Sequence, residues 1–150
     1  MRRPVPYSVA GITLAELLLV VALIGILLVL ALPGYRQHVL ETGRRAATAE
    51  LRAVLAAQEQ FFAQHHRYAL QLNELGLPGA SYAIDAQGNR VSAASRQRIY
   101  LIGSRDDGGS PLLYARPLLG QVSDSRCGTL SLTVTGRRLA SGQGGVAMCW

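Results

Sequence analysis

The feature that most restricts this 150-residue chain is a run of 16 residues, Leu17 to Leu32, without one polar side chain. The apolar stretch reaches back to Ile12 and is interrupted only by Thr13 and Glu16. As an α-helix it would span roughly 30 Å, which matches the hydrocarbon core of a bilayer. The sequence therefore predicts an apolar helix over residues 12–34 that is long enough to cross a membrane.

The segment before this helix indicates its orientation. Residues 1–11 include Arg2 and Arg3 and no acidic residue. By the positive-inside rule this end stays in the cytoplasm and the rest of the chain lies outside. Three interpretations fit: a secretory signal peptide cleaved near Val29 and Ala31, a permanent single-span anchor, or a signal that is cut before the apolar helix and leaves the helix in the mature protein.

Glu16 helps to separate these interpretations. A carboxylate costs about 2.5–3.5 kcal/mol at the centre of a membrane and less near the interface. A cleaved signal peptide would gain nothing from it. An acid that reaches back to the interface is the plain alternative. Otherwise an intramembrane acid indicates a function and requires a cationic partner.

Residues 11–18, Gly-Ile-Thr-Leu-Ala-Glu-Leu-Leu, resemble the type IV prepilin signature, and Pro33 stands where the family has a proline. The resemblance implies that residues 1–11 are a leader. A prepilin peptidase would cut between Gly11 and Ile12 and methylate the new amino terminus on Ile12, where the family usually has phenylalanine. It also implies that Glu16 faces the N-terminal ammonium of a neighbouring subunit. Such pairing would relieve the cost of a buried charge and set the register between subunits.

A second helical pattern follows Pro33 and Gly34. Apolar residues recur at steps of three, four and seven and predict an amphipathic helix over residues 35–66. The row consists of Leu40, Ala47, Leu51, Val54, Leu55, Gln58, Phe61 and Phe62. Together the two helices form one rod of about 50 residues, which we expect to be kinked or locally melted at Pro33. Glu41 and Arg45 are spaced to form a surface ion pair.

Residues 67–150 contain an ordered connector and then short runs separated by turn residues. The runs are Ser81 to Asp85, Arg98 to Gly103, Leu112 to Leu118 and Thr129 to Thr135. In the last run Leu130, Leu132 and Val134 point one way, which is typical of a half-buried antiparallel strand. Pro117 would confine the end of its run to a sheet edge. We predict an α+β fold, the type IV pilin fold, in which a three- or four-stranded antiparallel meander covers the rear helix.

Cys127 and Cys149 are the two cysteines of the chain. Such a pair suits an extracytoplasmic disulfide better than a metal site, which needs more ligands. Closing a loop of this length would contribute about 3 kcal/mol in the chain-entropy model. The end of the chain, from Cys127-Gly128-Thr129-Leu130 to Trp150, resembles minor pilins of the PilE kind. In pilins the region enclosed by a C-terminal cysteine pair lies on the exposed flank of the fibre.

Nothing in the sequence indicates catalysis. It contains no nucleophile motif, phosphate loop or metal-ligand spacing. His65 and His66 are best explained as basic residues at a helix C-terminus, and Asp106 and Asp107 as part of a solvated turn rather than a calcium loop. We expect no enzymatic activity, no cofactor and no metal.

The basic residues leave nucleic acid as a secondary possibility. All 15 are arginine, and removal of Arg2 and Arg3 would lower the formal net charge from +6 to +4. Seven could form a stripe for phosphates: Arg44, Arg45, Arg52, Arg96, Arg98, Arg137 and Arg138. Interleaved aromatic residues are sparse and no known docking motif is present, so DNA binding is the lesser interpretation.

The sequence is therefore most consistent with a structural subunit, a minor pilin, of a type IV pilus that serves motility, adhesion or DNA uptake. The resemblance implies as partners other pilins, a prepilin peptidase, and an inner-membrane assembly platform with its ATPase. It also implies a single-pass protein of a Gram-negative-type inner membrane that later enters an extracellular fibre. The alternatives are a pseudopilin of a type II secretion system, which the cysteine pair disfavours, and a membrane-anchored binding module that never polymerises.

Overall fold

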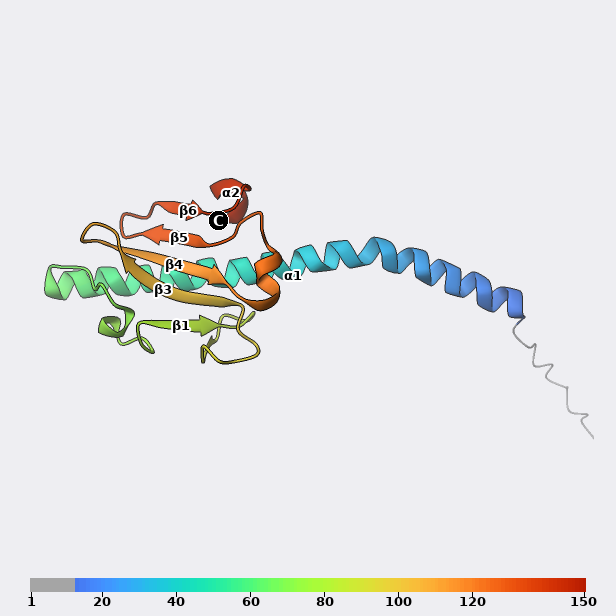
Figure 1. The fold of residues 1–150 in the computed structure, drawn as a ribbon, viewed down its shortest axis with the longest axis horizontal. Helices are drawn as coiled ribbons and strands as arrows, with labels where there is room; N and C mark the ends of the chain where they lie inside the picture. The colour runs from blue at the N-terminus through green and yellow to red at the C-terminus, as the bar shows by residue number, and fades with distance from the viewer. Residues whose placement is uncertain (1–12) are drawn as a thin grey trace, which may run out of the picture. The chain divides into compact units, whose positions relative to one another are not determined.

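The computed structural model describes residues 13–150, and its first element is one long helix (Figure 1). Helix α1 runs from Leu14 to His65, and Thr13 caps it by accepting a hydrogen bond from the Glu16 N–H at 3.2 Å. The backbone stays helical across Pro33, so the prediction of local melting there is wrong. A proline removes one N–H from the helical ladder, and the leucine-rich turn before it, residues 28–32, favours the helix.

The chain forms two compact units, residues 1–37 and residues 38–150. In the first unit the helix is exposed on every side wherever its side chains are described. It is long and apolar enough to cross a membrane: its most apolar 18-residue window has a mean hydropathy of 3.0, and none of that window is buried. The described side chains of the first unit therefore form no buried core.

The second unit is the head, in which the rear half of α1 runs along one face of a six-stranded antiparallel sheet (Figure 1). The strand order is β2-β1-β3-β4-β5-β6. The strands are β1 (Ser81–Ile84), β2 (Arg90–Val91), β3 (Tyr100–Asp106), β4 (Pro111–Pro117), β5 (Leu130–Thr133) and β6 (Arg138–Ala140). The α+β pilin-like class is confirmed. The four predicted runs correspond to β1, β3, β4 and β5, which pair in that order. The structure adds two short edge strands, β2 beside β1 and β6 beside β5.

The core lies between the inner face of the sheet and the predicted stripe of α1. Ala47, Leu51 and Val54 of the helix are buried against Ile102 of β3 and Leu130 of β5, among others. The alternation in β5 places Leu130 and Leu132 inward. Val134 lies outside that strand, because the chain turns at residues 133–136, where the Gly136 N–H bonds to the Thr133 carbonyl at 2.9 Å. Burial of the stripe supplies the apolar contact that holds the sheet on the helix.

Strand β4 is central over most of its length, but its end at Pro117 has a partner strand on one side only, as the proline at the end of this run predicts. Pro117 is the last residue of β4 and pairs with Tyr100 of β3. On its other side β4 pairs with β5 only over residues 112–115. The missing N–H of Pro117 therefore lies beyond the ladder with β5, where a proline is tolerated.

Short elements connect these parts. The connector contains a 3-10 turn, η1 (Leu72–Leu75), in which Leu72 is fully buried. A second, η2 (Leu119–Ser123), follows β4, and the five-residue helix α2 (Gly145–Cys149) ends the chain. In the β1–β2 turn, hydrogen bonds from the Asn89 side chain and from backbone N–H groups lower the pKa of Asp85. The Asp85 carboxylate is therefore charged at neutral pH and stabilises this turn by accepting these hydrogen bonds.

One buried amide joins α1 to the connector. The Gln58 side chain is fully buried; its Nε2 donates to the Ala69 carbonyl at 2.7 Å and its Oε1 accepts from the Ala69 N–H at 2.9 Å. Both backbone groups of a buried residue therefore depend on one side chain. This explains why a glutamine continues an otherwise apolar row.

We predict that Gln58→Leu lowers the free energy of unfolding by at least about 2 kcal/mol, because two buried backbone groups lose their partners. The control is Gln60→Leu, which makes the same change on the exposed side of the same turn. Chemical denaturation of the full chain in detergent measures both. Equal stability of the two variants would contradict this role of Gln58.

Candidate functional site: the stem, the C-terminal clamp and the outer groove

The first candidate site is the apolar part of α1, residues 14–35, here called the stem, whose described side chains are all exposed. Glu16 lies in its first turn and is solvent-exposed, and its carboxylate has no ion-pair partner among residues 13–150. Gly11 and Ile12, the predicted processing site, lie outside the described residues. Pro33 lies within α1 near the end of the stem. Among its described side chains the stem thus presents one acid on an otherwise apolar surface.

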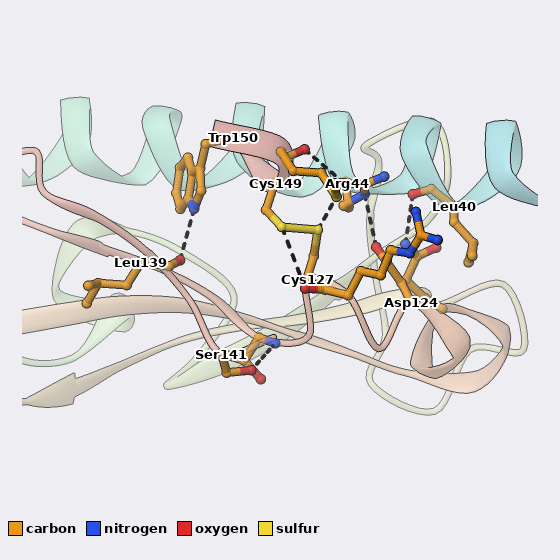
Figure 2. Close-up of a disulfide and its surroundings, with 12 residues drawn as sticks. Leu40, Arg44, Asp124, Cys127, Leu139, Ser141, Cys149 and Trp150 are labelled. Atoms are coloured by element: carbon orange, nitrogen blue, oxygen red, sulfur yellow. Dashed lines mark hydrogen bonds and ion pairs between the residues drawn. A yellow bond between two sulfur atoms is a disulfide. The ribbon is translucent and has the colours of Figure 1, made fainter. Parts of the chain in front are cut away.

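The second candidate site holds the C-terminus on the helix, and we call it the clamp (Figure 2). It consists of Arg44, Asp124, Cys127 and Cys149. A disulfide joins the two cysteines that the sequence pairs. The Arg44 Nη1 donates to the Cys127 sulfur at 2.9 Å and to the Met148 carbonyl at 3.1 Å. One side chain of α1 therefore contacts both ends of the disulfide-closed segment.

Arg44 and Asp124 form a buried ion pair at the centre of the clamp. The Arg44 Nε lies 3.0 Å from the Asp124 Oδ2, and the two side chains are 12% and 6% exposed. Neither of these atoms has hydrogen-bond geometry with any group among the described residues. Each charge is therefore compensated mainly by the other, as is required of charges away from water.

A buried glutamine extends this polar cluster toward the sheet. The Gln121 Nε2 donates to the Leu40 carbonyl at 2.9 Å and to the Tyr100 hydroxyl at 3.2 Å. Burial raises the pKa of Tyr100 to about 12, so its phenol stays protonated at neutral pH. Gly43 leaves space for this amide, because a Cβ there would overlap the Gln121 side chain.

The last residues are held by further contacts to the sheet (Figure 2). The Trp150 Nε1 donates to the Leu139 carbonyl at 2.9 Å, and the Ser141 hydroxyl accepts from the Thr129 N–H at 2.9 Å. The enclosed segment is less loop-like than its glycines suggest, since it contains β5, β6 and α2. The clamp thus fixes an ordered segment of the chain.

The third candidate site lies on the outer face of the sheet, opposite α1. A groove of about 370 Å³ is lined by Arg105, Tyr114, Arg116, Thr129 and Ser131. These residues come from β3, β4, β5 and the residue before β5. We call this the outer groove. Both arginines are exposed, and neither forms an ion pair with any residue that the structure describes.

A glycine positions the tyrosine of the outer groove. Gly103 of β3 pairs with Tyr114 of β4. A Cβ at position 103 would collide with the Tyr114 ring, so the phenol lies across the glycine backbone. Tyr114 is half-buried by this contact and still lines the groove. The ring is thereby held on the sheet instead of projecting freely.

The arginine stripe expected from the sequence is incorrect in its membership. Arg44 is buried in the clamp, and Arg45 lies 2.6 Å from Glu41 in the predicted i,i+4 pair. Conversely, the sequence interpretation missed Arg105 and Arg116. Strand alternation was the available signal, since each arginine follows an outward-facing residue, Gly103 or Tyr114, by two positions.

The histidine and aspartate residues singled out in the sequence make ordinary local contacts. His65 stacks on Phe61 at a centroid distance of 4.1 Å. The Asp106 carboxylate accepts from the Gly109 N–H at 2.7 Å, as expected of a turn. Over residues 13–150, no three His, Cys, Asp or Glu side chains are grouped so that they could hold a metal ion.

A continuous helix with an uncovered apolar front half, and with a disulfide-closed antiparallel sheet on its rear half, defines a type IV pilin. A family model described as "Type IV minor pilin ComP, DNA uptake sequence receptor" matches residues 33–131, which are 99 of the 150 residues. The chain therefore belongs to this family of type IV minor pilins. Pilins are structural proteins that assemble with one another into a pilus.

A curated relative supports the same class. Over 85 residues the chain is 39% identical to the "Type IV major pilin protein PilA" of Myxococcus xanthus (strain DK1622). The aligned stretch covers 57% of this chain and 38% of the relative, so the chain spans well under half the length of that protein.

The clamp yields a prediction about stability. Asp124→Asn leaves Arg44 charged and buried without its counter-ion, which should lower the free energy of unfolding by about 3–5 kcal/mol. Replacing both partners, as in Arg44→Met with Asp124→Leu, should cost less than Asp124→Asn alone, because no unpaired charge remains. Denaturation of the full chain in detergent measures these differences.

The matched control is Glu41→Gln, which breaks the ion pair of the adjacent arginine. That pair is 76% and 45% exposed, so its loss should cost only a few tenths of a kcal/mol. If Asp124→Asn were no more harmful than Glu41→Gln, the clamp would not depend on its buried ion pair.

Proposed function

We propose that this chain is a minor subunit of a type IV pilus that takes part in DNA uptake. The observation that carries the proposal is the stem, whose described side chains are apolar apart from Glu16 and are exposed on every side of the helix. The same helix continues into the head, where its rear half packs in the core. Such a surface requires lipid or other apolar helices around it. In a pilin, lipid surrounds the stem while the protein is in the membrane, and the helices of other subunits surround it in the fibre.

The processing steps follow from the N-terminal signature. A prepilin peptidase cuts between Gly11 and Ile12 and methylates Ile12, with the leader in the cytoplasm and the head outside the inner membrane. An assembly platform with its ATPase then moves the stem from lipid into the fibre. The new ammonium on Ile12 pairs with Glu16 of a neighbouring subunit. Glu16 lacks an ion-pair partner among the described residues of its own chain, which supports such an external partner.

DNA uptake is supported by the family description and by the charge of the head. The matched family is described as a DNA uptake sequence receptor. Of the 12 arginines in the head, residues 38–150, eight form no ion pair with any described residue. Free guanidinium groups favour contact with phosphates, so DNA reception becomes the preferred activity of the head.

The proposal is tested by Glu16→Ala in host cells that lack the native copy. The variant should remain in the inner membrane, but its amount in sheared pili should fall at least about tenfold, since the partner's ammonium is left unpaired in an apolar core. DNA uptake should fall with it. Quantitative immunoblots of membrane and pilus fractions and a transformation assay measure these effects.

Glu41→Ala is the control, because it removes an acid from the same helix within the head. Normal incorporation of Glu16→Ala into pili would contradict the assembly role. A chain that never enters sheared fibres would favour the membrane-anchored module, and one needed only for protein secretion would favour the pseudopilin.

A further inference from the structure

We propose that the outer groove binds a single strand of DNA, with phosphates on Arg105 and Arg116 and a base stacked on the Tyr114 ring. This inference rests on the proposed role in DNA uptake and adds the site and the form of the ligand. The residues that carry it come from strands β3 and β4. They were outside the stripe predicted from the sequence.

The spacing of the two arginines suits a nucleic-acid strand. Arg116 pairs with Leu101, four residues before Arg105 on β3. The two side chains therefore start about 13 Å apart along the strands, on either side of Tyr114. Neither guanidinium is used in an ion pair among the described residues. Both are free to contact successive parts of one sugar-phosphate backbone.

Local charges do not cancel this arrangement. Asp106 adjoins Arg105 in sequence, but alternation along β3 places it on the opposite face, and its carboxylate accepts from the Gly109 N–H at 2.7 Å. Residues Thr129 and Ser131 complete the lining with hydroxyl groups, which can donate to phosphate oxygens.

The tyrosine indicates a single strand rather than a duplex. Its ring lies across Gly103 and remains half-exposed in the groove. A fixed ring on a sheet can stack on a base only if that base is unpaired, as in other sheet-based readers of single strands. A broad sheet face also cannot enter the major groove, which admits a helix or a two-stranded ribbon.

The test uses the full chain in detergent and fluorescence anisotropy with a labelled 12-nucleotide single strand and with the corresponding duplex. We expect the single strand to bind more tightly. Arg105→Gln with Arg116→Gln should lower the slope of log affinity against log salt by about 1.4, which corresponds to two lost phosphate contacts. The control, Arg52→Gln with Arg126→Gln, removes the same charge from two exposed arginines outside the groove.

The tyrosine is tested separately. Tyr114→Leu should weaken single-strand binding at least about fivefold through loss of stacking, whereas Tyr114→Phe should bind as the wild type does. Thermal unfolding of each variant shows whether the sheet is intact. Tyr114→Phe also guards against a purely structural effect, because it keeps the ring over Gly103.

The outcomes separate this inference from the proposed function. If the wild type binds neither form of DNA, both are overturned. If it binds DNA but the groove variants match the control, or if duplex binds more tightly and Tyr114→Leu has no effect, only the outer groove is overturned. Equal displacement by dextran sulfate and by the single strand would also overturn it, since the site would then recognise charge alone.

Discussion

The stem imposes the constraint on which the rest of the structure depends. An 18-residue window with a mean hydropathy of 3.0 and no burial within the chain cannot remain in water. It must be covered by lipid or by helices of other subunits. The stem can leave lipid only by entering another apolar environment, such as a bundle of like helices. Because the same helix continues into the head, the head must move with the stem and stay folded. The head is therefore built to be held firmly on the helix.

Two kinds of contact hold it there. Burial of the α1 stripe against the sheet supplies most of the apolar contact, and the clamp and the Gln58 amide fix the two ends of the head to particular turns of the helix. The clamp joins the last residues of the chain to Arg44 through a disulfide and a buried ion pair. A buried ion pair adds little net stability, but any arrangement that leaves one of its charges buried and unpaired is strongly destabilised. The pair therefore favours one position of the C-terminal segment on the helix, which suits a subunit packed against neighbours.

The sequence predicts much of this architecture because the long elements have clear periodicity. The two helical patterns, the β5 alternation between Leu130 and Leu132, and the turn at residues 106–109 are all local signals. Strands β2 and β6 have only two and three residues, too few to show a period. The Arg44–Asp124 pair joins residues 80 positions apart, and the outer groove depends on the register of β3 with β4, which places Tyr114 over Gly103. Tertiary contacts of this kind leave no pattern in the sequence.

The most direct test of the account is the intact mass of the chain recovered from sheared pili. We predict that the mature protein begins at Ile12, lacks residues 1–11, retains the whole stem and carries one methyl group. A chain that still begins at Met1, or a soluble product cut after Ala31, would contradict the central claim that the stem becomes part of a fibre.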